Sequence, residues 1–488
     1  MPFFQKALII FALIIGLWLR LYHLDAPVAD WQSFRQADTA SVTRIFTDEG
    51  IDLLYPRYHD LSNIQSGTDN PQGWRMVELP IYNALSAYYH QIFSTNIEIS
   101  SRMISILFSL GSAILIYLIC YQTTKLFWPS FLSLTMFLFL PFNIYYSRAI
   151  LPEPTAVFFM LLSLYLFKPS TILSGISLAV AILVKPYTAL IIFPTLLLFT
   201  FQKYKKNIRL RSFLILLLFS AVSLLPFIWW RHWITQFPAG IPKSDWLLNN
   251  SASTTFPNWY RGFNLTFLNK LVAFRPHWWQ WLFNQRISNL ILGTFGIIPL
   301  FLGFAYKKNK TQLFSFCLLS GIFLYFIIIA QGNIQHDYYQ VLIIPFLAIL
   351  SGFGYYFIQN FLFDSKIVSV IILFIIFTFS TYFSWQQIRG YYQINRPQII
   401  DAGQKAKDLL PSQSLVIAPY NGDTAFLYQT GFRGWPTEVY NLPEIIKAHP
   451  DNHIYLVSVN YDQYTNSLIA KYPVIYKNND YIILKLSP

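Results

Sequence analysis

The chain has 488 residues, of which 55% are hydrophobic and 19% aromatic, while only 12% are charged. This much apolar surface exceeds what one soluble core can bury, so the composition excludes an ordinary soluble protein and indicates a polytopic membrane protein. The formal net charge is +13, yet the basic residues lie in short connections between apolar runs. This distribution excludes a dedicated nucleic-acid-binding domain, and we expect no nucleic-acid partner.

Eleven apolar segments are predicted to cross the membrane as helices, because crossing takes roughly 20 mostly apolar residues. In chain order they lie near residues 5–24, 102–122, 127–146, 154–168, 171–184, 187–202, 212–230, 288–306, 312–330, 338–358 and 367–386. The first segment lacks the small-residue cleavage site of a signal peptide, so we interpret it as a retained helix.

Lysine and arginine indicate the orientation of these spans. The basic residues of the inward connections are Lys6, Lys125, Lys168, the run 203–211, the run 307–310 and Lys366. They fall in every second connection, and connections rich in lysine and arginine stay in the cytoplasm. The N-terminus is therefore predicted to be cytoplasmic, and the odd number of spans puts the C-terminus outside.

Residues 1–390 are predicted to form one transmembrane domain, with large outward connections at 25–101 and 231–287. The first connection contains the aromatic stretch I-Y-N-A-L-S-A-Y-Y-H-Q-I-F, which is too short to span and predicts an interfacial helix on the outer leaflet. After Tyr391 the hydropathy drops, and strand-like runs such as S-L-V-I-A alternate with helix-like pieces. The predicted fold class is an α-helical polytopic membrane protein with a small extracytoplasmic α/β domain at 391–488.

Isolated charges concentrate at the outer ends of the predicted spans. The residues concerned are Asp30, Asp38, Glu78, Arg148, Glu153, Lys185 and His336. Ionisable groups at membrane depth cost several kcal/mol unless they are paired or hydrated, which makes them candidate site residues. We predict that they converge on one extracytoplasmic cleft; the alternative is that each merely marks the outer end of a helix.

Five short motifs give the chain a family resemblance over residues 5–350. In order they are D-W-Q-S-F-R-Q-A-D-T-A, V-E-L-P-I-Y, S-R-A-I-L-P-E-P, L-V-K-P and Q-H-D-Y-Y-Q. This ordered set resembles the GT-C fold glycosyltransferases that use polyprenyl-phosphate sugars, the group containing protein O-mannosyltransferases and the aminoarabinose transferase that modifies lipid A. The resemblance implies a GT-C-like fold and favours the plasma membrane of a bacterium.

In that family a carboxylate of the first loop acts as general base on the acceptor hydroxyl. Many members have adjacent Asp-Glu there, whereas this chain has Arg35-Gln36, so the resemblance transfers the role to Asp38 or Asp30. Asp38 is preferred, because a helix beginning near Gln36 would place it in the first turn, facing the cleft; helix capping by Asp38 is the alternative. Glu78 corresponds to a second acidic group at the acceptor, and a favourable charge at a helix N-terminus is its other interpretation.

Several residues are predicted to bind the donor phosphate. These are Arg148, Lys185, His336 and Arg35, with Glu153 and Tyr339 in support. Arg148 and Lys185 are chosen because two cations at the outer leaflet suit a lipid phosphate, and His336 resembles the family histidine at the start of the late span. Cations there would stabilise the charge that grows on the leaving group. Glu153 is predicted to position Arg148 through an ion pair. Lys185 could instead snorkel to lipid headgroups, and His336 could pair with Asp337.

No metal or other cofactor is predicted, because the repeated acidic motif of metal-dependent members is missing. A divalent cation held by Asp30, Asp38, Glu78 and His336 stays open as the alternative.

The predicted function is transfer of a single sugar, with inversion, from a polyprenyl-phosphate donor in the membrane to an extracytoplasmic acceptor. One alternative is an O-antigen ligase or polymerase with a diphosphate-linked donor, which the arginines of the late loop favour: Arg231, Arg261, Arg275 and Arg286. A flippase for lipid-linked sugars is the other alternative. Long outer loops and the scarcity of charges within the spans argue against the flippase.

Overall fold

The computed structural model describes residues 2–204, 210–243, 275–306 and 309–487. The chain divides into two compact units. The helical unit contains the described residues within 1–22, 105–231 and 244–390. The mixed unit contains His23–Ile104, His232–Lys243 and the described residues from Tyr391 onward.

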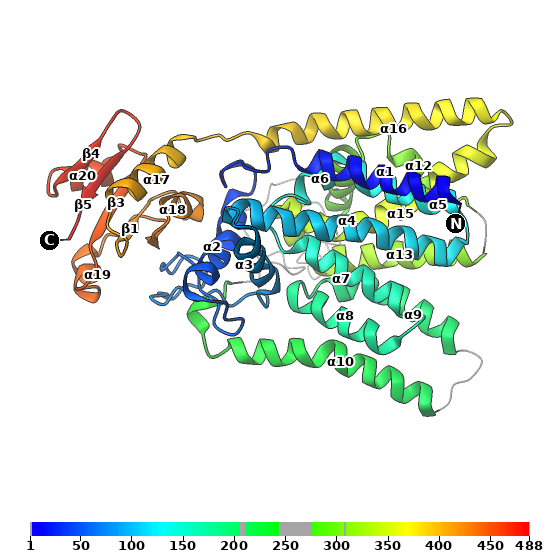
Figure 1. Ribbon diagram of the computed structural model, residues 1–488, viewed down its shortest axis with the longest axis horizontal. Coiled ribbons are helices and arrows are strands. Elements are labelled where there is room, and N and C mark those ends of the chain that lie inside the picture. The colour runs from blue at the N-terminus through cyan, green and yellow to red at the C-terminus, as the bar shows by residue number, and fades with distance from the viewer. Residues whose placement is uncertain (1, 205–209, 244–274, 307–308, 488) are drawn as a thin grey trace. The chain divides into compact units, whose positions relative to one another are not determined.

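Helices make up the helical unit (Figure 1). They are α1 (Phe3–Arg20), most of α4 (Ile97–Thr124), α5 (Phe127–Phe139), α6 (Pro141–Tyr146), α7 (Glu153–Leu166), α8 (Thr171–Val184), α9 (Thr188–Tyr204), most of α10 (Leu210–Ile234), α11 (Pro276–Trp281), η6 (Leu282–Ile291), α12 (Ile297–Leu302), α13 (Asn309–Ile328), α14 (Gly332–Gln335), η7 (Asp337–Ile343), α15 (Ile344–Phe357), η8 (Ile358–Leu362) and α16 (Lys366–Ile388).

Six stretches of the described chain are long and apolar enough to cross a membrane. They are Phe3–Arg20, Ile97–Thr124, Ser212–Ile234, Thr311–Ile328, Asp337–Leu362 and Lys366–Tyr392. Four shorter apolar helices, α5, α7, α8 and α9, coincide with further predicted spans. The helical membrane class is therefore confirmed, whereas the count of eleven spans stays a prediction.

Two predicted spans are broken in the structure. The segment 127–146 divides at Leu140, which is extended before Pro141, because proline disfavours the helical conformation in the residue before it. The segment 288–306 divides between η6 and α12 at Gly293 and Thr294, which both have positive φ. Hydropathy detects neither break, since apolar residues continue across both of them.

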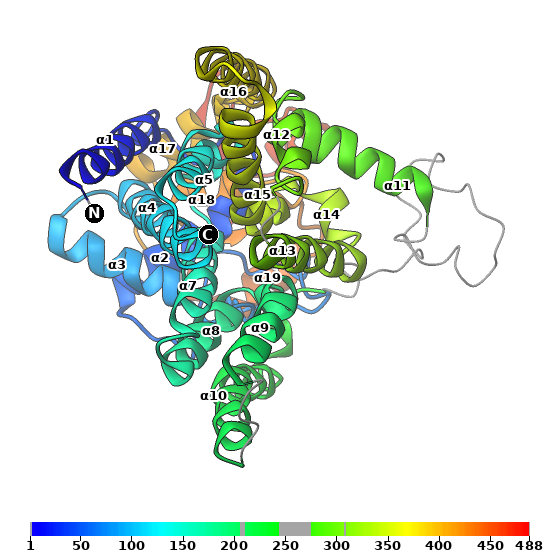
Figure 2. The same ribbon diagram turned by 90° about the vertical axis from the view of Figure 1, so that its right-hand side faces the viewer.

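The core of the helical unit forms around α15, which packs against α5, α12 and α13 (Figure 2). Small residues allow the close approach. A Cβ added to Gly352 would lie 2.5 Å from the backbone nitrogen of Ser133, and one added to Gly354 would lie 1.7 Å from the carbonyl oxygen of Pro299. Substitution of either glycine would push α15 away from a neighbouring helix.

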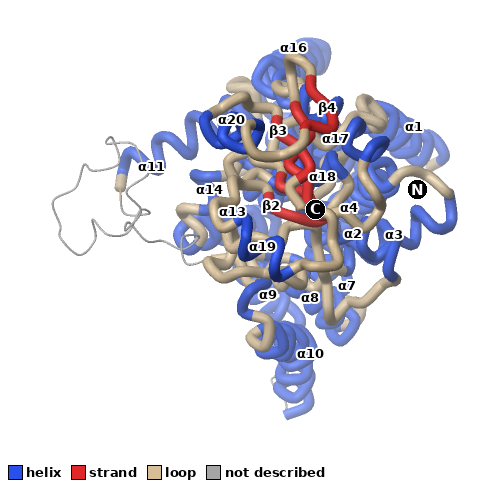
Figure 3. Tube along the Cα trace, turned by 90° about the vertical axis from the view of Figure 1, so that its left-hand side faces the viewer, coloured by secondary structure: helices blue, strands red, loops and turns tan. Residues whose placement is uncertain are grey.

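A five-stranded sheet forms the C-terminal part of the mixed unit, in the order β2-β1-β3-β5-β4 (Figure 3). The strands are β1 (Leu415–Ile417), β2 (Arg433–Trp435), β3 (Ile454–Ser458), β4 (Val474–Lys477) and β5 (Ile482–Lys485). Strand β1 pairs in parallel with β2 and β3, while β5 pairs antiparallel with β3 and β4. The helices are α17 (Gln398–Leu409), α18 (Thr424–Thr430), α19 (Leu442–Ala448) and α20 (Gln463–Ile469). The predicted small α/β domain is confirmed as a fold.

The remainder of the mixed unit comes from earlier in the chain. It includes α2 (Ser33–Glu49), α3 (Ile81–Phe93) and the short turn η1 (Pro238–Gly240). Helix α2 packs against both α3 and α18, and the backbone of Gly434 in β2 bonds to His59 and Leu61 of the first loop. Residues 391–488 were predicted as a domain by themselves; in the structure they share one compact unit with the first outward loop. Helix α3 coincides with the predicted interfacial helix, and its place at a membrane surface stays a prediction.

Candidate functional site

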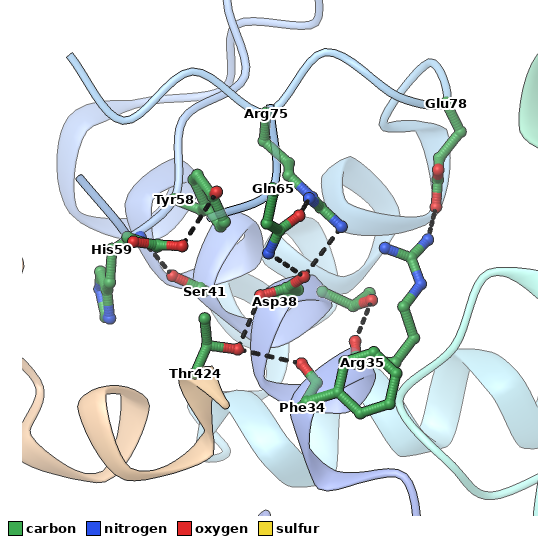
Figure 4. Close-up of polar contacts among 12 residues, drawn as sticks. Phe34, Arg35, Asp38, Ser41, Tyr58, His59, Gln65, Arg75, Glu78 and Thr424 are labelled. Carbon is green, nitrogen blue, oxygen red and sulfur yellow. Dashed lines mark hydrogen bonds and ion pairs between the residues drawn. The ribbon is translucent and has the colours of Figure 1, made fainter. Parts of the chain in front are cut away.

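Asp38 of α2 lies at the centre of a polar cluster in the mixed unit (Figure 4). Its side chain is only 2% exposed. The oxygen Oδ2 accepts from Arg75 Nη2 at 2.8 Å and from Gln65 Nε2 at 3.0 Å. The other oxygen, Oδ1, accepts from the Thr424 hydroxyl at 2.7 Å. A buried carboxylate with three donors, one of them a cation, is held in one orientation.

The helix that carries Asp38 begins earlier than predicted. Gln32 adopts the left-handed conformation with φ 59°, and α2 starts at Ser33, because the left-handed residue ends the preceding loop and lets the helix begin at once. Asp38 is therefore in the second turn, and the prediction of a first-turn position is wrong. A second-turn residue cannot cap the helix, so the capping interpretation is also excluded.

Arg35 and Glu78 form an ion pair beside Asp38. Together with Asp38, Thr39, Arg75 and Asn83 they line a small pocket between α2 and the segment that leads into α3. Asp30, the second candidate base, accepts a hydrogen bond from Gln36 Nε2 at 2.7 Å and is not among the described residues that line this pocket. The pocket thus brings together Arg35, Asp38 and Glu78 of the predicted residues.

Two further carboxylates lie near Asp38, and the sequence analysis missed both. Burial raises the pKa of Asp60 to about 6, and the negative charge of Asp38 adds to this shift. Burial likewise raises the pKa of Asp423 to about 6. Asp60 accepts from the Ser62 backbone N–H at 2.8 Å and the Tyr58 hydroxyl at 3.3 Å, while Asp423 caps α18 through the Ala425 N–H at 2.7 Å.

The donors to Asp38 were also missed. Arg75 stands three residues before Glu78 in the motif W-R-M-V-E-L-P, so a search for a cation near the predicted acidic residues would have found it. Gln65 and Thr424 carry no sequence signal, because polar neutral residues are common in loops. Thr424 comes from the C-terminal part of the chain, 386 residues after Asp38.

In the helical unit, Lys185 and Glu153 form an ion pair with 2.8 Å between Nζ and Oε1. Glu153 begins α7 and Lys185 directly follows α8, and both side chains are buried. Arg148 precedes α7 and is 1% exposed, with its guanidinium 5.1 Å from the ring centre of Tyr145. Charged side chains that are buried among apolar helices require such partners. Glu153 was predicted to pair with Arg148; the structure gives it Lys185 as a partner.

His336 directly precedes η7 and Tyr339 lies within it. Helix η7 packs against α7. The His336 ring stacks on Tyr338 and Tyr339, with ring centres 5.2 and 6.4 Å apart. The neighbouring Asp337 accepts from the Tyr146 hydroxyl at 2.5 Å and lies 3.8 Å from Arg286 Nη1. Asp337 was considered only as a partner of His336, yet Tyr146 and Arg286 engage its two oxygens.

Comparison with known proteins gives one family and several related structures. Residues 73–242 match the family described as dolichyl-phosphate-mannose-protein mannosyltransferase. The crystal structure of ArnT from Cupriavidus metallidurans in the apo state is similar with a TM-score of 0.60 and 13% identity, over 99% of both chains. The chain has the GT-C fold. The resemblance inferred from the ordered motifs is thereby confirmed.

Two other GT-C structures support the same assignment of fold. ArnT from Cupriavidus metallidurans bound to undecaprenyl phosphate matches with a TM-score of 0.61 and 13% identity, over 98% of both chains. The archaeal oligosaccharyltransferase AglB from Archaeoglobus fulgidus matches with a TM-score of 0.55 and 10% identity, over 94% of this chain and 70% of that one. No curated protein matches the sequence.

Within this GT-C chain the predicted site residues fall into two groups. Asp30, Arg35, Asp38 and Glu78 belong to the mixed unit, whereas Arg148, Glu153, Lys185, His336 and Tyr339 belong to the helical unit. Their convergence on one cleft stays a prediction. Of the late-loop arginines, Arg261 lies outside the described residues.

The arrangement of possible ligands bears on the alternative of a divalent cation. The described residues contain no cluster of three or more His, Cys, Asp or Glu side chains that could hold one. The side chains bound to Asp38 are all hydrogen-bond donors, whereas a hard cation needs several oxygen ligands.

Proposed function

We propose that this protein is a membrane glycosyltransferase that moves one sugar from a polyprenyl-phosphate donor to a hydroxyl group outside the cytoplasm. The observation that carries the proposal is a fixed, buried carboxylate, Asp38, at a polar pocket in a chain with the GT-C fold. Relatives support the donor class, since ArnT has been solved with undecaprenyl phosphate and AglB with a dolichol-phosphate and an inhibitory peptide.

In the proposed reaction Asp38 takes the proton from the acceptor hydroxyl as the oxygen attacks the anomeric carbon. The bond between that carbon and the phosphate oxygen breaks, and its electron pair leaves with the polyprenyl phosphate. Direct displacement of this kind inverts the anomeric centre. Glu78, held by Arg35 at the same pocket, is proposed to bind the acceptor.

The donor phosphate needs cations, because negative charge grows on the leaving oxygen. We assign this task to Arg148 and Lys185, with His336 as a hydrogen-bond donor and Arg35 as a further cation. Glu153 supports the group by holding Lys185 at 2.8 Å, and Tyr339 supports it by stacking with His336.

We further propose eleven spans, a cytoplasmic N-terminus and an outward mixed unit in a bacterial plasma membrane. The alternation of lysine- and arginine-rich connections supports this orientation. The six long stretches and the four shorter apolar helices, α5, α7, α8 and α9, would supply ten of these spans. The broken segment 288–306 would supply the eleventh.

The test is a transfer assay in membranes containing the protein, fed with short-chain polyprenyl-phosphate hexoses, pentoses and aminopentoses. Asp38→Asn should lower turnover about 10² to 10⁴-fold, the usual contribution of a general base. Asp30→Asn should lower it far less, and Asp401→Asn, at an exposed position of α17, serves as the matched control.

Two outcomes would contradict the proposal. Full activity after Asp38→Asn and Asp30→Asn, singly and together, would exclude a first-loop base. Release of product only from diphosphate-linked donors would favour the ligase, and movement of lipid-linked sugar across vesicles without consumption would favour the flippase.

A further inference from the structure

We infer that Thr424, from the C-terminal part of the chain, is a positioning residue for the base Asp38. The inference rests on the proposed function and goes beyond it, because it gives the C-terminal part a role in the chemical step. The Thr424 hydroxyl donates to Asp38 Oδ1 at 2.7 Å, and the threonine is 6% exposed.

The hydrogen bonds of Asp38 identify the oxygen that can take a proton. Each carboxylate oxygen offers about two acceptor sites. Arg75 and Gln65 occupy both sites of Oδ2, while Thr424 occupies one site of Oδ1. The remaining site on Oδ1 has no partner among the described residues, and Thr424 touches this same oxygen. The direction in which the base meets an acceptor hydroxyl therefore depends on Thr424.

Thr424 is itself held firmly. It is the first residue of α18, and the side chain of Asp423 caps that helix. Further along α18, Gln429 Nε2 donates to the Val28 carbonyl at 3.0 Å, and Arg44 Nη1 donates to the Tyr428 carbonyl at 3.0 Å. These contacts fix α18 to the segment before α2 and to α2 itself. The Thr424 hydroxyl is therefore already oriented toward Asp38 in the folded protein.

The Thr424 oxygen also lies 3.2 Å from the Phe34 carbonyl. A threonine hydroxyl has one hydrogen and can donate to only one of these acceptors at a time. The charged carboxylate is the stronger acceptor and lies closer. Once Oδ1 has taken the proton of the acceptor hydroxyl, the Thr424 hydrogen can turn to Phe34, and its oxygen can then accept from the protonated Asp38. Thr424 thus serves both protonation states of the base.

The experiment compares Thr424→Val with Thr430→Val in the same transfer assay. Thr430 is a matched control, since it is fully buried in the same helix and its hydroxyl donates to Leu427 O at 2.7 Å. Thr424→Val should lower kcat about 10- to 100-fold, as expected for a lost hydrogen bond to a charged group, with the donor KM unchanged. Thr424→Ser keeps the hydroxyl and should restore most of kcat.

The outcomes separate this inference from the proposed function. If the unaltered protein transfers no sugar, the proposed function fails. If it is active and Asp38→Asn is not, but Thr424→Val and Thr430→Val behave alike, the positioning role of Thr424 is overturned. Equal losses for Thr424→Val and Thr424→Ser would overturn it too. Should Thr424→Val fail to fold, Thr424→Ala removes the same hydroxyl and takes its place.

Discussion

Asp38 in the mixed unit and Glu153 in the helical unit are equally buried, each with 2% of its side chain exposed, but their surroundings differ. Asp38 accepts from a cation, an amide and a hydroxyl. Glu153 has an ion pair with Lys185 through Oε1, and its Oε2 has no hydrogen-bond partner within the described ranges. Two equally buried carboxylates therefore differ in their partners: Asp38 has three donors, whereas Glu153 has an ion pair at only one of its oxygens.

The difference follows from where the donors come from. The mixed unit draws on loops and on the C-terminal segment, which are rich in polar residues and can deliver several donors to one atom. The helical unit is made of apolar helices, where each polar side chain costs free energy to bury. The base proposed at Asp38 would need a fixed orientation, whereas the cations proposed for a lipid phosphate would need charge more than direction.

Removing Lys185 should have the largest effect on stability. Lys185→Met leaves the Glu153 carboxylate buried without its cation, which costs about 3 to 5 kcal/mol when a buried pair is broken. We expect a lower melting temperature of the detergent-purified protein and a raised donor KM. Lys447→Met, at an exposed position of α19, is the control and should have no effect.

The double variant Glu153→Gln with Lys185→Met sharpens this test. It removes both charges, so it should recover most of the melting temperature while leaving the donor KM high. A single Lys185→Met variant as stable as the unaltered protein would mean that Glu153 is supported as well as Asp38.

Asp60 should give the mixed unit a pH-dependent stability of intermediate size. Burial raises its pKa from 3.8 to about 6, so the folded protein holds this proton more tightly than the unfolded chain. Its contribution is fully present below about pH 4 and is lost as the pH rises to about 6, a change of about 3 kcal/mol. Asp60→Asn should flatten the dependence of melting temperature on pH across this interval.

The control for Asp60 is Asp69→Asn, at an exposed position of the same loop. It should keep the pH dependence of the unaltered protein. If Asp60→Asn and the unaltered protein lose stability in parallel between pH 4 and 6, the buried carboxyl group of Asp60 is not the cause.

The ion pair between Arg433 and Glu49 should matter least. It joins the same two parts of the mixed unit as the contact between Thr424 and Asp38, with Nη2 and Oε1 2.6 Å apart, but its side chains are 28% and 39% exposed. Arg433→Gln should cost less than about 1 kcal/mol of unfolding free energy, because water screens such pairs. A loss as large as that of Lys185→Met would show that exposure does not decide the strength of these pairs.

Three residues of the candidate pocket could be selected from the sequence because charge is scarce in a membrane protein. Asp38 and Glu78 were selected as isolated charges beside apolar segments, Arg35 was selected as a cation for the donor phosphate, and all three line one pocket. Helix α3 begins at Ile81 and ends at Phe93, as the aromatic stretch predicted. Local pattern suffices for such features, since they depend on residues close in sequence.

The rest depends on contacts between distant residues. The donors Gln65 and Thr424 are ordinary polar residues until the fold brings them to Asp38. The start of α2 depends on one left-handed residue, Gln32, which no periodicity reveals. The first loop and the C-terminal segment share one compact unit. This arrangement depends on tertiary contacts, which hydropathy does not predict.

The hydrogen bond between Thr424 and Asp38 joins residues that are 386 positions apart. At a synthesis rate of about 5 to 20 residues per second, roughly 20 to 80 s pass between their emergence from the ribosome. During that interval α2 lacks its packing partner α18. Formation of this hydrogen bond is therefore tied to synthesis of α18, and a chain that stalls before Thr424 lacks the hydroxyl that we propose to orient Asp38.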